Sequence, residues 1–221
     1  QYIFTLQIKK LFGHLNSITS TSNTIVSGKS NTVSDSSNCE IGGDGNTINN
    51  GDNSIVSGKG HSITDSSNVL VFGLSNQVKT TTLNSLVSGK SHIETTGSNN
   101  ALFGEDHETT SSENTLSTGK NHTINTGKQS IISGKDHTIN TATNVIVSGE
   151  SNSVSSSTNT NVMGISLSAT NDNNSFVELS FKWDSDYESV EYEIFGNKGT
   201  VYKGEISSIV SSSDFIQLFN N

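Results

Sequence analysis

The sequence predicts an all-β fold: a parallel β-solenoid or β-roll of about eleven 15-residue coils, followed by a small C-terminal β domain. Branched aliphatic residues recur two residues before and five residues after most of a series of evenly spaced glycines. Fifteen residues are too few for a helix-containing repeat and suit one solenoid turn, whose strands stack about 4.8 Å apart. Every step is 15 residues except the step of 16 after position 73, and the glycines stand at 13, 28, 43, 58, 73, 89, 104, 119, 134, 149 and 164.

The period divides the chain into three expected regions. Residues 1–10 alternate apolar and polar side chains and are expected to form an N-terminal strand that leads into the first coil. Residues 11–170 contain the repeats. Residues 171–221 lose the period, and their short apolar runs predict a small β domain that caps the solenoid or joins it to a neighbour.

Asparagine marks one turn of almost every coil. Five residues before the glycine, nine coils carry Asn and a tenth carries Gln129. Stacked in register, such amides can hydrogen-bond from coil to coil as a ladder. The predicted ladder consists of Asn23, Asn38, Asn53, Asn68, Asn84, Asn99, Asn114, Asn144 and Asn159.

A second polar column, three residues after the glycine, holds either Asn or His in the first ten coils. We expect it to be a solvated turn at which His replaces Asn, without a metal or any other cofactor. The alternative is a transition metal shared by His92, His107, His122 and His137, which stand on consecutive coils. Four stacked imidazolium charges would repel one another, which predicts pKa values below the usual value of about 6.5 and a loss of stability in acid.

An apolar column three residues before the glycine has no place in the interior. The residues next to it face inward, so its side chains point to the outside of the sheet, and phenylalanines one residue before the glycine share that face. An exposed stripe of this length is typical of a self-association surface. This predicted surface, called the apolar stripe below, consists of Ile25, Ile55, Leu70, Phe72, Leu86, Phe103, Leu116, Ile131 and Ile146.

Four copies of one motif end on the column glycine: "NSIVSG" (53–58), "NSLVSG" (84–89), "QSIISG" (129–134) and "NVIVSG" (144–149). They resemble the head repeats of YadA-like trimeric autotransporter adhesins. The resemblance implies a left-handed parallel β-roll that trimerises through one sheet and has an adhesive role, over roughly residues 11–170. The chain departs from that family in its period of 15 and in the Asn at its turns, and it shows neither a neck motif nor a heptad stalk.

Composition argues against several classes of partner. All twelve basic residues are Lys, so the chain has no guanidinium group for bidentate contacts to phosphates or base edges. Because its net charge is also −9, nucleic acid is not an expected partner. No apolar run reaches the length of a membrane span. Cys39 is the only cysteine, which excludes an intrachain disulfide.

Ice binding is a second functional hypothesis. Triplets with Ser or Thr first, Ile or Val in the middle and Ser, Thr or Asn last recur in seven coils, and would stack into a flat, hydroxyl-rich face. Lys79, Glu94 and Glu108 are expected to interrupt that face. An enzyme is not expected, because no distinctive motif brings a nucleophile, a base and an orienting acid together.

These patterns favour a non-enzymatic structural or adhesive element of an extracellular, cell-surface or virion-surface fibre. Its first expected partner is a copy of itself, bound through the apolar stripe or the ends, as a trimer or a head-to-tail fibre. The other expected partner is a surface glycan or a host receptor, and a glycan-binding tail-fibre segment is a further alternative.

Overall fold

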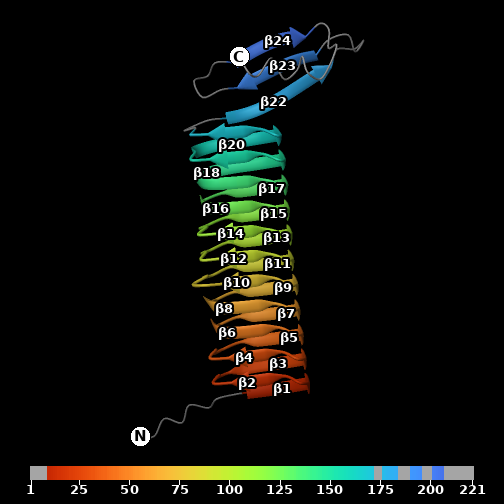
Figure 1. Cartoon of the computed structure of the whole chain (residues 1–221), viewed down its shortest axis with the longest axis vertical. Helices are drawn as coiled ribbons and strands as arrows, with labels where there is room; N and C mark the ends of the chain where they lie inside the picture. Colours follow the sequence, from red (N-terminus) through yellow and green to blue (C-terminus); the bar gives the residue numbers. More distant parts are fainter. Residues whose placement is uncertain (1–8, 172–175, 184–189, 196–200, 207–221) are drawn as a thin grey trace.

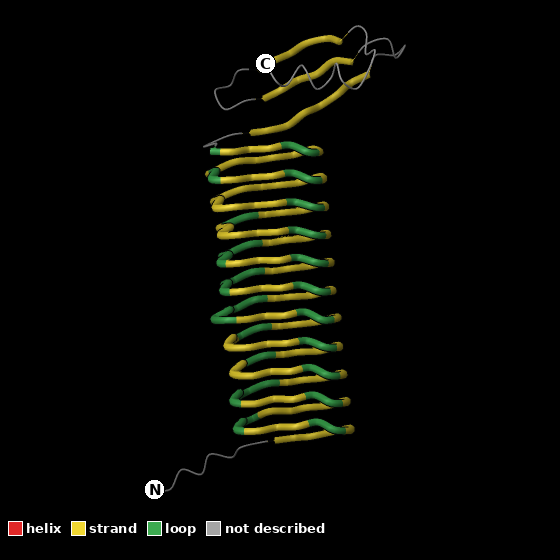
Figure 2. The backbone as a smooth tube through the Cα atoms, in the orientation of Figure 1, coloured by secondary structure: helices red, strands yellow, loops and turns green. Residues whose placement is uncertain are grey.

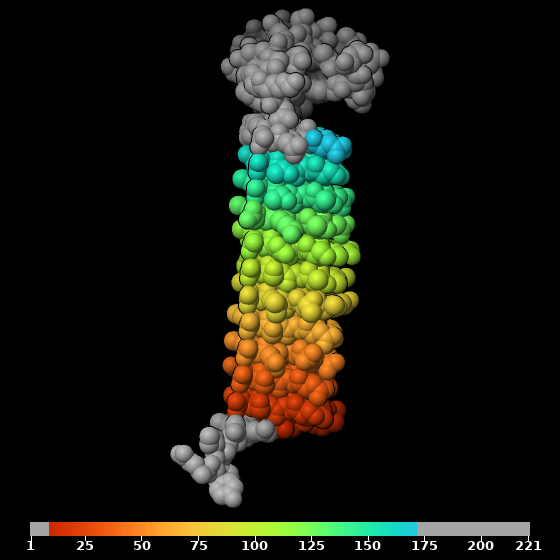
Figure 3. All heavy atoms as spheres, turned by 90° about the vertical axis from the view of Figure 1, so that its left-hand side faces the viewer, coloured from red at the N-terminus to blue at the C-terminus, as the bar shows by residue number. Residues whose placement is uncertain are grey.

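The computed structural model is an all-β stack of coils, and its described residues contain no helix (Figure 1). It describes residues 9–171, 176–183, 190–195 and 201–206, with side chains for 9–171. The coils follow one another along one axis, with strand and turn segments at the same places in successive coils (Figure 2). In space-filling view they form a narrow, straight column (Figure 3). The predicted parallel β-solenoid is confirmed.

The first sheet takes the glycine-containing strand of each coil. Its strands pair in parallel with glycine opposite glycine, as in Gly13↔Gly28 and Gly28↔Gly43. Its members are β1 (Lys9–His14), β3 (Thr24–Lys29), β5 (Glu40–Asp44), β7 (Ile55–Lys59), β9 (Leu70–Leu74), β11 (Leu86–Lys90), β13 (Ala101–Glu105), β15 (Leu116–Lys120), β17 (Ile131–Lys135), the last part of β18 (Thr138–Glu150), and β20 (Thr158–Ile165).

The second sheet consists of the strand that follows the column glycine in each coil, and it too pairs in parallel. The first part of β18 belongs to this sheet, because Thr138 pairs with Thr123 of the preceding coil. Its other members are β2 (Ser17–Thr19), β4 (Thr32–Ser34), β6 (Thr47–Asp52), β8 (Ser62–Ser67), β10 (Gln77–Lys79), β12 (Ile93–Thr95), β14 (Glu108–Thr110), β16 (Thr123–Lys128), β19 (Ser153–Ser155) and β21 (Ser168–Thr170).

The coils bend at residues with positive φ. Asn38 has φ 55°, in the left-handed region that Asn tolerates better than most residues. At Gly73, φ is 109° and an added Cβ would lie 2.0 Å from the carbonyl oxygen of Gly89, so only glycine fits. The 16-residue coil accommodates its extra residue at a bend, where both Thr80 and Thr81 have positive φ. The glycine period therefore reflects the close approach of successive backbones.

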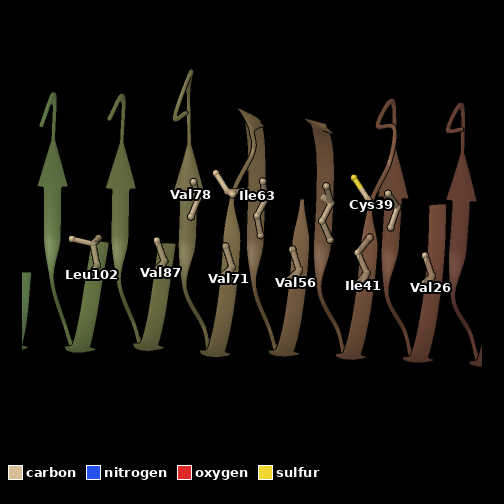
Figure 4. Packing of buried hydrophobic residues seen from close by; sticks show 12 residues of the cluster. Val26, Cys39, Ile41, Val56, Ile63, Val71, Val78, Val87 and Leu102 are labelled. Atoms are coloured by element: carbon tan, nitrogen blue, oxygen red, sulfur yellow. The ribbon is translucent and has the colours of Figure 1, made fainter. Parts of the chain in front are cut away.

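The two predicted aliphatic columns fill the interior. Val26, Ile41 and Val56 of the first sheet follow one another along the axis, and Ile63 and Val78 lie on the other side (Figure 4). All five are at most 1% exposed. Burial of such a side chain contributes roughly 1.5–3 kcal/mol. The core forms two clusters, one ending at residue 102 and the other beginning at residue 124.

Beyond the coils lie β22 (Phe176–Trp183), β23 (Val190–Phe195) and β24 (Val201–Ile206). β22 continues the first sheet by pairing in parallel with β20, and β23 pairs antiparallel with both β22 and β24. A separate capping or assembly domain at 171–221 remains a prediction. The expected N-terminal strand is described only from Lys9, where β1 begins; Tyr2, Phe4, Leu6 and Ile8 lie outside the described residues.

Candidate functional site

The apolar stripe lies on the outer face of the first sheet. Ile55, Leu70 and Ile131 are 41%, 38% and 48% exposed, whereas Phe72 and Leu86 are half-buried. From Ile55 to Ile146, strand register places this position of successive coils side by side, with Ala101 joining Leu86 to Leu116, whereas Ile25 lies apart, beside Glu40. Seven consecutive coils therefore present an unbroken aliphatic row to the surface.

Charged side chains follow the column glycine on the same face and pair between coils. Glu105 accepts hydrogen bonds from Lys90 at 2.6 Å and from Lys120 at 3.1 Å, and these bonds lower the pKa of its carboxyl group. Lys135 and Glu150 form a similar pair at 2.8 Å. These groups are partly exposed, so water and salt weaken the pairs. Their importance is that charges of both signs at the edge of the apolar stripe pair within the chain.

The Asn ladder runs along an exposed corner of the coils. The Nδ2 of Asn38 donates to Oδ1 of Asn53 at 3.0 Å, and Asn53 repeats the bond to Asn68 at 3.1 Å. The same bond links Asn23 to Asn38, Asn68 to Asn84, Asn84 to Asn99, Asn99 to Asn114, and Asn144 to Asn159. Asn thus has two roles at this corner: it tolerates the positive φ of the bend, and its side-chain amide links successive coils.

The Asn/His column three residues after the glycine, called the corner column below, contradicts the expectation of a solvated turn. His92, His107, His122 and His137 are at most 1% exposed, and Asn31 is fully buried. The prediction was wrong because the polar side-chain atoms are satisfied by backbone groups of their own coil and of the next one, which the residue types alone do not indicate. Buried polar groups are tolerated when they are hydrogen-bonded in this way.

Asn and His share two hydrogen bonds in the corner column, and the Asn Nδ2 also donates to the glycine carbonyl one coil on, as from Asn31 to Gly43 O at 2.9 Å. Asn31 Oδ1 accepts the backbone N–H of the residue one coil on, Asn46, at 3.0 Å, and its Nδ2 donates to Ser27 O at 2.9 Å. His122 Nδ1 accepts the N–H of His137 at 3.3 Å, and its Nε2 lies 3.0 Å from Thr118 O. An imidazole can do both only as the neutral tautomer with its hydrogen on Nε2. Both residue types therefore accept the same backbone N–H of the next coil.

Burial is the main cause of the low histidine pKa values. It lowers the pKa of His92 and His122 from 6.5 to about 4, with a smaller contribution from the charge of neighbouring histidines. The predicted direction was right, but the predicted main cause, repulsion, was wrong. His61 makes this clear, because its neighbours in the column are Asn46 and Asn76 and burial still lowers its pKa.

A metal shared by the four histidines does not fit this geometry. The rings are stacked, with centroids 4.6–4.9 Å apart, rather than converging on one point. The Nδ1 lone pairs of His92, His107, His122 and His137 all accept backbone N–H groups. Within residues that the structure describes, no group of three or more His, Cys, Asp or Glu side chains is placed to hold a metal.

A buried polar cluster that the sequence did not predict interrupts the core. Glu94 is 0% exposed, and its Oε1 accepts hydrogen bonds from Ser85 at 2.9 Å and Asn100 at 2.8 Å. Burial raises the pKa of this carboxyl group. Its Oε2, Thr109 Oγ1 and Ser117 Oγ are buried without a hydrogen-bond partner. Glu94 stands five residues after the glycine, in a column that is otherwise mostly aliphatic and buried. Its position in that column could therefore have predicted that Glu94 is buried.

The Ser/Thr face is the outer face of the second sheet. Thr32, Thr47 and Ser62 lie side by side in register, with Val33 and Ile48 buried beneath. Glu94 was expected to interrupt this face. That prediction was wrong, because its side chain is buried in the core. The run of hydroxyl groups ends after Ser62, because Gln77, Ile93 and the exposed Glu108 follow it at the same outer position.

A polar hollow of about 370 Å³ lies beside the first coils and had no sequence prediction. Asp52 lines it, and its Oδ1 accepts the hydroxyl of Ser37 at 2.7 Å. Thr21, also in the lining, has a buried hydroxyl group without a partner. The remaining lining residues are Lys9, Ser20, Ser22, Asp35 and Ser36.

Comparison with known proteins identifies no family. No protein-family model matches the chain, and no curated protein matches it either. The YadA-like resemblance therefore rests on the repeat motif alone. Over the described part of the chain, no helix has the length and apolar character needed to cross a membrane.

Proposed function

We propose that this solenoid is a non-enzymatic structural element of an extracellular or virion-surface fibre and associates with copies of itself through the apolar stripe. The unbroken aliphatic row from Ile55 to Ile146 supports this most directly. It spans seven coils, roughly 30 Å along the axis at the usual strand spacing. Exposed apolar patches of such extent usually mark interaction surfaces, because leaving them in water is unfavourable.

A second copy is the occupant that fits this face. The bordering charges already pair within the chain, at Lys90–Glu105 and Lys135–Glu150, so a partner need not supply a complementary charge. The row is also regular in its spacing, as is the row on any other copy. Three copies around a common axis, as the repeat resemblance implies, would bury three stripes against one another.

Two substitutions on the stripe test this proposal. Leu70→Asp with Ile131→Asp should convert oligomers into monomers, because each adds a charge that would be buried in the interface. The matched control is Thr47→Asp with Ser168→Asp, two exposed positions on the other sheet, which should leave the oligomer intact. Mass photometry reads the result. A wild-type protein that is monomeric at micromolar concentration would contradict self-association.

Two other functions each have one supporting observation. The in-register hydroxyl groups of Thr32, Thr47 and Ser62 favour ice binding, which thermal hysteresis of the purified protein tests. The hollow lined by Asp35, Asp52 and serine hydroxyls favours a glycan ligand, because such groups hydrogen-bond sugar hydroxyls. Binding on a glycan array that is lost in Asp52→Ala would establish this role. An adhesive function would require such a foreign ligand.

A further inference from the structure

The corner column links successive coils through atoms that are acceptors only while the histidines are neutral. His61 Nδ1 accepts the N–H of Asn76 at 3.1 Å, and His137 Nδ1 accepts that of Asn152 at 3.1 Å. Between His92 and His137, three more bonds of this kind join consecutive coils. An asparagine in the same place makes this bond through Oδ1, which does not titrate near neutral pH.

Protonation would reverse the role of each Nδ1. The new Nδ1–H would face a backbone N–H, so one hydrogen bond between coils would be lost and two donors would oppose each other. The rings are at most 1% exposed, so water does not offset that loss. Within the row, the next ring lies less than 5 Å away, so a second charge would also be repelled.

We propose that the five buried histidines form an acid-sensitive lock: neutral, they join the coils, and protonated, they separate them. The device belongs to a single chain and does not depend on self-association. Acidification would loosen the solenoid at His61 and along the continuous row from His92 to His137. The asparagine-lined coils would lack this sensitivity.

The histidine pKa values support this direction. The charged groups near the row are Asp106 and Asp136, which favour protonation of the nearby rings, but burial outweighs them. With folded pKa values below 6.5, the folded state binds fewer protons than the unfolded chain. Stability is therefore complete above pH 6.5 and is lost as pH falls below it. For His92 and His122, with pKa values of about 4, the unfolding constant should rise roughly 20-fold each between pH 7 and pH 5.

Replacing the five histidines by asparagine, the residue that the column otherwise uses, tests the lock. The variant carries H61N, H92N, H107N, H122N and H137N. Guanidinium unfolding followed by circular dichroism at pH 7 and pH 5 compares it with wild type. All other titratable groups are common to both proteins. The difference between their pH dependences therefore reports the contribution of the five histidines. Between pH 7 and pH 5, the folding equilibrium constant of wild type should fall by a factor several hundred times larger than that of the variant. Equal losses would overturn the proposal.

Two further measurements apply even if the fivefold variant does not fold. In wild type, imidazole ¹⁵N NMR should show the Nε2–H tautomer for the five buried histidines, and His92 and His122 should not titrate above pH 5 while the fold persists. Five imidazoles that titrate near pH 6.5 in an intact fold would overturn the lock. Asn76→His, which would join His61 to the row, should make the protein more acid-sensitive, and an unchanged pH dependence would also count against it.

Discussion

The aliphatic coils and the polar coils of this solenoid differ in their interiors but not in their backbone pairing. Around Val56 and Ile63 the core is aliphatic, whereas Glu94, Thr109 and Ser117 interrupt it further along. Strands β11, β13 and β15 nevertheless pair in the register of all other coils. The glycines and the corner column are common to both regions. We infer that these two columns hold the coils in register and that the aliphatic core adds stability.

The largest expected effect comes from the glycine column, in both regions equally. Gly43→Ala and Gly119→Ala each place a Cβ within about 2 Å of the next glycine's carbonyl oxygen, at φ 113° and 120°. Each should therefore cost more than about 4 kcal/mol or prevent folding. Chemical denaturation measures the loss.

Gly45→Ala is the control for these two variants. Its φ is 66° and nothing lies within 4 Å of an added Cβ, so the cost should be about 1 kcal/mol. A loss at Gly43 much greater than at Gly119 would show that the aliphatic region depends on its register more than the polar region does.

The next effect distinguishes the two interiors. Ile63→Ala should cost about 2–5 kcal/mol, because it leaves a cavity in a packed aliphatic column. Thr109→Val, at a later position of the same column, should stabilise by about 1 kcal/mol, because it removes a buried hydroxyl without a partner. Unfolding midpoints measure both. Destabilisation by Thr109→Val would indicate that this hydroxyl is satisfied in solution.

Glu94→Gln should change the pH dependence in the direction opposite to that of the histidines. Because the folded pKa of Glu94 is raised, its contribution is full below the unfolded value of 4.5 and is lost as pH rises towards the folded value. Glutamine does not ionise, so the variant should be more stable than wild type at pH 7, and the gain should shrink in acid. Thermal melts from pH 4 to pH 8 measure this.

The matched control for Glu94→Gln is Glu108→Gln, an exposed position on the next coil. It should give no comparable gain. If Glu94→Gln leaves the pH profile unchanged, the carboxyl group is not desolvated as its burial indicates.

The smallest effect is expected at the border of the apolar stripe. Glu105→Gln removes the partner of Lys90 and Lys120, but these side chains are partly exposed and flexible. The melting temperature of the variant should therefore match that of wild type at physiological salt. A clear decrease would show that this pair is held in a drier setting, as an interface between copies would provide.

Sequence periodicity was sufficient for the fold but not for the full interior. The glycine steps and the aliphatic columns predict strand order, coil length and core positions such as Ile41 and Val71, because a parallel stack repeats one environment. The same periodicity could not show that His107 is buried, since its Nε2 is satisfied by Phe103 O in its own coil and its Nδ1 by the N–H of His122 in the next coil. Glu94 was misplaced for a related reason: a carboxylate was taken to face water although its column faces inward.

Hydrogen exchange of the native protein tests most directly whether the glycines and the corner column, rather than the aliphatic core, hold the register. The amides to compare are those donated to the corner column in the two regions: Asn46 in the aliphatic region, His107 and His122 in the polar one. At pH 7, where the histidines are neutral, we expect similar protection for all three after correction for intrinsic exchange rates. Protection at Asn46 that exceeds that at His107 and His122 by orders of magnitude would contradict this claim and make the aliphatic core the element that holds the coils together.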